Sequence, residues 1–365
     1  MMDLLAVALA GVHFALPLAY YSYAKARWLP KPWNLKLDEN YRPKVTIILP
    51  TYNEAKLIEA RLDNLYGQDY PKNLMEIIVI DSNSNDGTPE IVERWAKQHS
   101  ELTLKLIREE ARRGKAHALN HALKYANGEI IVIADADAFW PSDALSKAVM
   151  ILSDPSIGAV SCLKRPLGSG IAGVEGSYRR YYNVLRIAES KAYSTSIFHG
   201  ELAAFKADLL KDMGGFPSDI GADDSYTATK IVLKGFRAII PEDLWVDEKV
   251  PEENYLSWRI RRAQHLIQHF AMSLRFREVP SKFRRILLIE GYLHLVNPWL
   301  LVVAAIMLLF ALLHHSIIAV VALTLGLMLL TFKPYRTWIT AQLCLIVGAI
   351  RNLYTKEIVW AKQIK

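Results

Sequence analysis

Short apolar runs rich in β-branched residues alternate with amphipathic stretches of helical length in the middle of the chain. The runs cover residues 45–50, 76–81, 102–107 and 129–135. A strand buried on both faces reads as such a run, and a helix-length segment between two runs is typical of a βαβ unit. The pattern therefore predicts an α/β domain over residues 42–251, built on a parallel sheet with its ligand site at the carboxyl ends of the strands.

The amino-terminal residues 4–23 form a second kind of pattern, an uncharged apolar run with the length of one membrane-spanning helix. Asp3 precedes this run, and Lys25, Arg27 and Lys31 follow it. A signal peptide has its basic residues before the apolar core, so this order excludes one. We expect residues 1–25 to anchor the chain in a membrane, with the amino end outside.

A longer apolar region follows the α/β domain, from about residue 286 to residue 350. Residues 293–332 have room for a pair of transmembrane helices, over 293–313 and 316–332. A third crossing over 338–350 would be short and would put Arg351 and the lysines after it outside, against the positive-inside tendency. We therefore expect residues 333–365 to hold a short membrane or interfacial helix and a basic cytoplasmic tail, in a multi-pass protein of the cell membrane whose α/β domain is cytoplasmic.

Composition and charge point to the same environment. The chain has 44 Lys and Arg against 37 Asp and Glu, a net charge of +7, and 52% hydrophobic residues. Much of the basic charge lies beside apolar segments, which favours the lipid bilayer over nucleic acid as its partner. Residues 258–276 alternate basic and apolar positions at helical spacing, so we expect amphipathic interface helices over 252–292. The two cysteines belong to no CxxC or Cys/His cluster, so neither a disulfide framework nor a zinc site is supported.

Two aspartates, Asp135 and Asp137, end the fourth apolar run, with only Ala136 between them. In an extended strand the two side chains would share one face. Two like charges side by side repel, and they are tolerated in water, in turns, or around a cation that both bind. Hard cations such as Mg²⁺ and Mn²⁺ prefer oxygen ligands of this kind. The alternative is that one aspartate caps a helix beginning near Pro141.

Six motifs occur in order along the same region. They are VTIILPTYNE (45–54), DSNSNDGT (81–88), GKAHALNHAL (114–123), ADAD (134–137), HGELAAFKADLL (199–210) and GADDSYTATKIVLKGF (221–236). Together they resemble the family 2 inverting glycosyltransferases. With the flanking apolar helices and WRIRRAQH (258–265), the chain is similar in plan to small cellulose-synthase-like members, including archaeal membrane mannosyltransferases that act on lipid-linked glycans.

The resemblance implies a GT-A-type nucleotide-binding sheet and a nucleotide-sugar donor, with GDP-mannose favoured over a UDP-hexose. It implies a role for each group of polar residues in the motifs. Asp224 would be the general base, Asp135 and Asp137 the ligands of Mg²⁺ or Mn²⁺, and Arg262 a diphosphate partner. The nucleotide would be bound by Pro50, Tyr52, Glu54, Asp81, Lys115 and Asp135, and the acceptor by His199, Gly200 and Asp223.

Several of these residues have structural roles that the sequence leaves open. Glu54 is also placed to cap a helix after Asn53, and Asp223 to cap the helix that follows it. Lys115 next to a glycine also suits a solvated loop, and His199 a packed core position. Arg262 also suits the surface of a basic amphipathic helix that lies against lipid.

The motifs depart from the family pattern in two places. Asp81-Ser82 stands where an aspartate doublet is usual, and the QxxRW element of processive synthases falls on Arg259, Arg262 and Ala263, without its glutamine and tryptophan. This favours transfer of one hexose, in β linkage, to a polyprenyl-phosphate-linked glycan over processive UDP-glucose-dependent polysaccharide synthesis. The absence of a glycine-rich loop after the first strand and the presence of the Asp223-Asp224 motif count against a nucleotidyltransferase. Spanning helices without buried charges give little support to a non-catalytic membrane scaffold or transporter. No protein partner is indicated.

Overall fold

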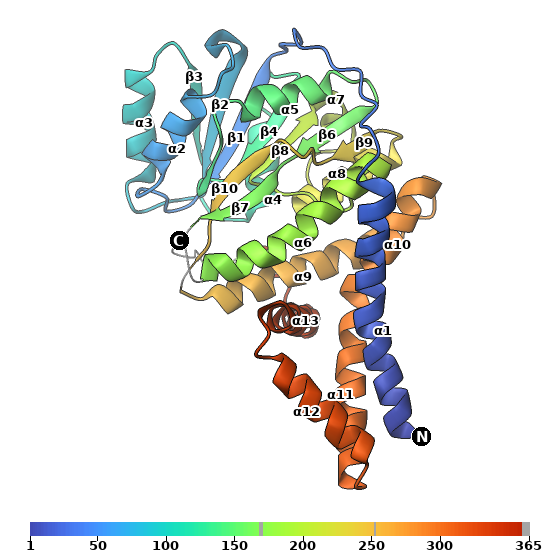
Figure 1. Cartoon of the computed structure of the whole chain (residues 1–365). Coiled ribbons are helices and arrows are strands. Elements are labelled where there is room, and N and C mark those ends of the chain that lie inside the picture. Colours follow the sequence, from blue (N-terminus) through green and yellow to red (C-terminus); the bar gives the residue numbers. More distant parts are fainter. Residues whose placement is uncertain (168–170, 252, 360–365) are drawn as a thin grey trace.

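The computed structural model describes residues 1–167, 171–251 and 253–359. An α/β domain lies on a group of helices, and α1 (Met2–Tyr23), α11 (Asn297–Leu313) and α12 (Ile317–Leu329) extend away from it on one side (Figure 1). The α/β domain expected over residues 42–251 corresponds to the part that carries all the described strands.

The main sheet has seven strands in the order β3-β2-β1-β4-β8-β6-β9. Its bounds are β1 (Val45–Thr51), β2 (Met75–Asp81), β3 (Thr103–Arg108), β4 (Ile130–Ala134), β6 (Ile157–Ser161), β8 (Leu202–Lys206) and β9 (Arg237–Ile239). The four strands predicted from the sequence are β1 to β4, and they pair in parallel. The sheet as a whole is mixed, because β8 runs antiparallel to both β4 and β6. The parallel pairing expected for the four predicted strands is confirmed, and the strands that make the sheet mixed were not predicted.

A second, smaller sheet covers the edge near the site. It has the order β5-β10-β7, with β5 (Ala138–Phe139), β7 (Leu163–Leu167) and β10 (Trp245–Lys249). Strands β7 and β10 contain charged residues and β5 has only two residues, so none of the three reads as a continuous apolar run or as clean alternation, and none was predicted.

Two hydrophobic cores lie on the two faces of the main sheet. Alternate residues of β1 point into the two cores, because Val45, Ile47 and Leu49 belong to one core and Ile48 belongs to the other. The first core packs under α2 (Ile58–Tyr66), α3 (Thr88–Gln98) and α5 (Ala144–Leu152). The second packs under α4 (Lys115–Leu123), α7 (Ala207–Asp212), α8 (Asp223–Leu233) and the start of α10 (Ser281–Leu295). Burial on both faces explains why β1, β2 and β4 are mainly apolar.

Among the residues that the structure describes, two helical stretches are long and apolar enough to cross a membrane, Met2–Trp28 and Ser281–Leu313. They include the spans expected over 4–23 and 293–313. The span expected over 316–332 forms only the 13-residue α12, and at about 1.5 Å per residue this falls short of a bilayer core of about 30 Å. After a 103° bend it is followed by α13 (Lys333–Arg351), which gives the pair the form of a broken span or a re-entrant loop.

Two further helices join the apolar helices to the α/β domain. They are α6 (Ile171–Ala192) and α9 (Tyr255–Ser273), which lie side by side below it in Figure 1. Arg259 on α9 donates to Glu175 on α6 over 2.6 Å. After α13, the chain returns along α9, where Gln268 Nε2 donates to the Lys356 carbonyl over 2.8 Å. The last part of the predicted basic tail, residues 360–365, lies outside the described residues.

Candidate active site

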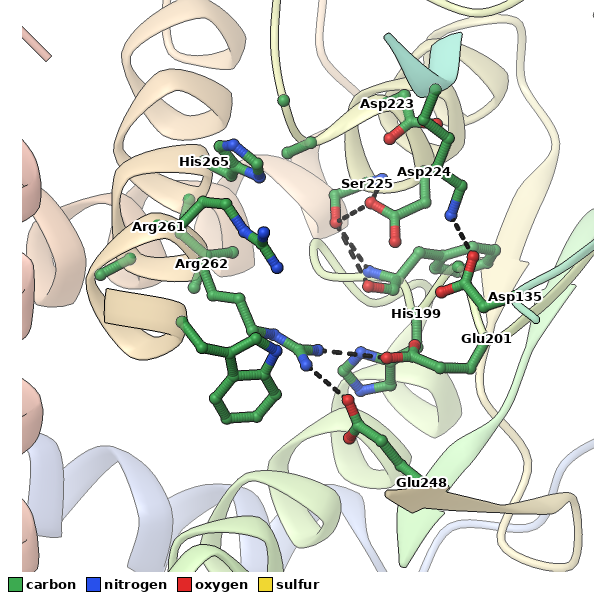
Figure 2. A pocket seen from close by; sticks show the side chains of 18 of the residues that line it. Asp135, His199, Glu201, Asp223, Asp224, Ser225, Glu248, Arg261, Arg262 and His265 are labelled. Atoms are coloured by element: carbon green, nitrogen blue, oxygen red, sulfur yellow. Dashed lines mark hydrogen bonds and ion pairs between the residues drawn. The ribbon is translucent and has the colours of Figure 1, made fainter. Parts of the chain in front are cut away.

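A cavity of about 340 Å³ opens at the carboxyl ends of β1 and β4 and continues between α8 and α9. All but one of the predicted site residues line it: Pro50, Tyr52, Glu54, Lys115, Asp135, Asp137, His199, Gly200, Asp223, Asp224 and Arg262. Figure 2 shows the central part of this pocket, with acidic residues of the α/β domain facing basic residues of α9.

The strand directions explain why residues so far apart in sequence meet here. Parallel strands β1 and β4 end at the same edge of the sheet, so the residues after each strand come together. Strand β8 is antiparallel to β4, so its beginning lies at that edge and brings His199, Gly200 and Glu201 with it. The amino end of α8 adds Asp223 and Asp224.

Asp81 is the exception among the predicted residues. It is buried at the end of β2, where it accepts hydrogen bonds from the Thr51 hydroxyl (3.2 Å) and the Ser84 backbone N–H (2.8 Å). The next residue, Ser82, lines the pocket. In this structure Asp81 therefore holds the loop after β2, and its contact with the nucleotide base stays a prediction.

Asp135 and Asp137 lie in the turn between β4 and β5, so the extended strand assumed for them was wrong. Both still line the pocket. The capping alternative was also wrong, because α5 begins at Ala144 with Asp143 at its N-cap. Lys115 Nζ lies 2.5 Å from Asp135 Oδ1. Burial opposes the charge on Lys115, but Asp135 and Asp223 together raise the pKa of the lysine above its ordinary value. Lys115 is therefore a paired cation of the pocket, not a solvated loop lysine.

Asp223 and Asp224 lie in the first turn of α8, whose N-cap residue is Ala222, so capping does not account for them. Burial, followed by the negative charge of Asp223, raises the pKa of Asp224 to about 7. Asp223 Oδ2 is buried and has no hydrogen-bond partner in the described part of the chain. A carboxylate with a pKa near neutrality is suited to accept a proton at physiological pH.

Gly200 lies against two of these side chains. A Cβ atom at this position would be 2.8 Å from Lys115 Nζ and 3.3 Å from Asp224 Oδ2. A side chain at this position would therefore displace the ammonium group of Lys115 from its place beside Asp224. The adjacent His199 is buried, and burial lowers the pKa of its imidazole well below the ordinary value, so the ring is neutral. It is thus both a packed histidine and a residue of the pocket wall.

Glu54 follows β1 at the opposite end of the pocket. Its backbone N–H donates to Thr88 Oγ1 over 2.8 Å, and its carbonyl accepts from the N–H of Ile58. The helix that follows, α2, has Leu57 at its N-cap and no side-chain cap. The capping role considered for Glu54 was therefore wrong.

A buried ion-pair cluster forms one wall, and sequence reasoning found only one of its members. Arg262 Nη1 donates to Glu248 Oε1 over 2.6 Å, and Nη2 donates to Glu201 Oε1 over 3.4 Å (Figure 2). Lys164, which is fully buried, donates to Glu201 Oε1 over 2.7 Å. Arg262 is therefore not a lipid-facing surface arginine. No local signal marks the other members, because Lys164 is followed by Arg165 and Glu248 lies between Asp247 and Lys249.

Other pocket arginines were also missed, among them Arg112 and Arg261. Arg112 lies over the ring of Tyr52, with the guanidinium carbon 4.0 Å from the ring centroid. Arg261 projects from α9 beside His265 (Figure 2). Arg112 forms part of no motif, and Arg261 lies in WRIRRAQH, where a role was predicted for Arg262 alone.

The pocket offers few protein ligands for a metal ion. No group of three or more His, Cys, Asp or Glu surrounds a single point within residues 1–167, 171–251 and 253–359. Asp135 and Asp137 supply two carboxylates, and a hard cation takes its other ligands from phosphate and water. The residues therefore fit a cation that enters together with a phosphorylated ligand.

Comparison with known proteins agrees with this geometry. The family described as Glycosyl transferase family 2 matches residues 46–214. The chain is 54% identical to the mannosyltransferase PcManGT from Pyrobaculum calidifontis, solved in complex with GDP-Man and Mn²⁺, with a TM-score of 0.92 over 98% of this chain and 100% of that one.

More distant relatives share part of the chain. Poly-beta-1,6-N-acetyl-D-glucosamine synthase of Staphylococcus epidermidis is 27% identical over 61% of this chain and 54% of its own length. The chain thus spans about half the length of the curated relatives it matches. S. aureus TarS, 23% identical over 69% of this chain and 71% of that one with a TM-score of 0.51, shows the fold alone. The predicted α/β sheet of the GT-A type with flanking helices is confirmed.

Proposed function

The chain belongs to glycosyltransferase family 2, and on this basis we propose that it transfers one mannose from GDP-mannose to a polyprenyl-phosphate-linked glycan, with inversion at the anomeric carbon. The observation that carries the proposal is that one pocket contains both Asp224 and the Asp135 and Asp137 pair, with Lys115 between them. One end then suits a donor diphosphate, and the other a proton acceptor.

The choice of donor is supported by the 54% identical mannosyltransferase, whose structure contains GDP-Man. Pro50, Tyr52 and Glu54 line the end of the pocket after β1, where a nucleotide binds in sheets of this kind. Glu54 and Asp135 offer carboxylate oxygens that accept hydrogen bonds from ribose hydroxyls or from ring N–H groups. Asp81 would contribute indirectly, because its hydrogen bonds hold the loop after β2 that borders the pocket.

Asp137 and Asp135 would hold Mg²⁺ or Mn²⁺ together with the donor diphosphate. When bound, such a cation acts as a Lewis acid that neutralises charge on the leaving group. Lys115 pairs with Asp135 and adds a positive charge at the same place, so it orients one carboxylate and attracts phosphate. The Mn²⁺ in the related mannosyltransferase supports this arrangement.

Asp224 would take the proton from the acceptor hydroxyl as that oxygen attacks the anomeric carbon. Its pKa of about 7 leaves a large share of the carboxylate ionised at neutral pH and still basic enough to accept a proton. Attack from the face opposite the diphosphate inverts the carbon, so an α-linked donor gives a β-linked product. His199, Gly200 and Asp223 would line the acceptor side, and the unpaired Asp223 Oδ2 is a candidate acceptor for a sugar hydroxyl.

The acceptor and the membrane location rest on the helices below the pocket. The cavity continues past Trp258 and Arg259 on α9 to Ala341 and Cys344 on α13. It therefore leads towards the apolar helices, the route that a lipid-linked acceptor would take. We propose a multi-pass protein of the cell membrane with its α/β domain in the cytoplasm, where nucleotide sugars are made.

Purified full-length chain, GDP-mannose and extracted polyprenyl-linked glycans test the proposal. The expected result is free GDP and an acceptor lengthened by one hexose in β linkage. A ladder of products would favour the alternative, a processive UDP-glucose-dependent synthase, and release of pyrophosphate would favour a nucleotidyltransferase. An α linkage would remove Asp224 from the role of base.

A further inference from the structure

A second cavity lies outside the catalytic pocket, where α6 approaches the carboxyl half of α1 (Figure 1). It is a groove of about 600 Å³. Leu18 and Tyr21 of α1 form one end of it, and Trp245 at the start of β10 forms the other. The groove therefore leads from a helix that is long and apolar enough to cross a membrane to the α/β domain.

Helix α6 separates this groove from the catalytic pocket. Successive residues of a helix point about 100° apart, so Tyr182 and Arg186, four positions apart, share one face. Arg180, Val184 and Ile187 share the opposite face by the same spacing. The first face lines the catalytic pocket, and the second lines the groove. The two cavities are thus separate sites on opposite sides of one helix.

The walls of the groove are largely apolar. Leu18 belongs to the apolar run of α1 and is 61% exposed, and Val184 and Ile187 face the groove from α6. The rings of Tyr21 and Tyr181 stack with their centroids 4.8 Å apart, and both line the groove. Tyrosines gather in this way at the headgroup level of a bilayer. Such walls suit a hydrocarbon chain that enters from the bilayer, because they offer apolar area to bury and few polar partners.

The charge at the groove is positive. Arg180 lines it and is exposed, and within the described residues it forms no ion pair and donates only to Ser177 Oγ, over 3.3 Å. Lys25 follows Tyr21 along the same helical stretch, with Nζ 5.9 Å from the centroid of that ring, and it has no ion pair in the same part of the chain. None of the described residues that line the groove is an aspartate or a glutamate. Two unpaired cations beside an apolar groove complement a lipid with an anionic headgroup.

We infer that this groove binds an anionic phospholipid of the cytoplasmic leaflet, with a chain between α1 and α6 and the phosphate at Arg180 and Lys25. The guanidinium of Arg180 offers paired donors to the phosphate oxygens. The inference rests on the proposed membrane location of α1, and it does not depend on the sugar-transfer activity. A lipid bound here would hold α6 at the bilayer surface from the side opposite the catalytic pocket.

The test uses purified full-length chain in detergent micelles and two phospholipids with the same brominated chains, phosphatidylglycerol and phosphatidylcholine. Bromine quenches the fluorescence of a tryptophan that it contacts, so the share of the quenching that Trp245→Phe removes reports lipid in the groove. We expect wild type to bind phosphatidylglycerol more tightly than phosphatidylcholine. Arg180→Gln should weaken phosphatidylglycerol binding about fivefold, the effect of one basic residue at an anionic surface, and leave phosphatidylcholine binding within about twofold. Val184→Phe, which fills the groove, should remove the Trp245 share for both lipids.

Arg284→Gln is the matched control, since Arg284 is an exposed arginine in the first turn of α10, outside the groove. It should leave the binding of both lipids at Trp245 within about twofold of wild type. The inference is overturned if wild type binds the two lipids equally, if Arg284→Gln has the same effect as Arg180→Gln, or if Val184→Phe leaves the Trp245 share unchanged. Wild-type chain whose tryptophans are quenched by neither lipid would instead contradict the membrane location, and the inference with it.

Discussion

Lys164 is the side chain whose removal should damage this protein most clearly. It is fully buried, and its Nζ lies 2.7 Å from Glu201 and 3.6 Å from Glu248. Burial opposes the charge of Glu201, but Lys164 holds the pKa of this carboxyl well below its usual range. Lys164→Met fills a similar volume and leaves both carboxylates buried. Losing one partner of a buried pair costs about 3–5 kcal/mol, and we expect the lower end because Arg262 still contacts both acids.

The next residue provides the control. Arg165 pairs with Asp247 over 2.6 Å, but its side chain is 60% exposed, so Arg165→Met should cost at most about 1 kcal/mol. For a domain of this size, 1 kcal/mol corresponds to about 2–4 °C in Tm. Thermal unfolding in detergent, followed by tryptophan fluorescence, should therefore separate Lys164→Met from wild type by at least about 6 °C. Adding Glu201→Gln should restore part of the loss. Equal melting temperatures for the Lys164 and Arg165 variants would refute the idea of a buried charge cluster.

Three further predictions concern catalysis and topology. Asp224→Asn should bind GDP-mannose normally and lose about 10²–10⁴-fold in kcat. The kcat/KM of wild type should rise with pH through about 7 as Asp224 loses its proton, and Asp223→Asn should shift that rise to lower pH. A pH-independent rate would contradict this role for Asp224. Excess chelator should abolish sugar transfer, and added Mg²⁺ or Mn²⁺ should restore it. Asp137→Ala should lose transfer activity at an unchanged Tm. Full activity in excess chelator would exclude a catalytic role for the metal. Cysteine labelling in intact cells should find residues 42–251 and the segment after Arg351 protected from outside reagents, and labelling of that domain from outside would refute the topology.

Much of the framework could be predicted from the sequence because it depends on local patterns. The strands β1, β2 and β4 are recognisable since burial on both faces makes each one mainly apolar, and β3 is recognisable from its alternation of leucine and isoleucine with polar residues. Helix α8 ends where Gly235 takes a positive φ of 92°. The first spanning helix likewise needs only length and apolar composition. The aspartates after β4 and at the start of α8 were found because motifs mark them in sequence.

Contacts between distant segments were decided by the tertiary structure alone. The antiparallel course of β8 depends on pairing with β4 and β6, which no local pattern encodes, and it brings Glu201 to the pocket. Lys164 reads as a surface charge until β10 and β8 surround it with Glu248 and Glu201. Arg261 and Arg262 are identical in sequence terms, and only the rotation of α9 against the α/β domain directs one towards buried glutamates and the other towards the open pocket. Side-chain chemistry is a local property, whereas the partner of a charge depends on which distant segment folds against it.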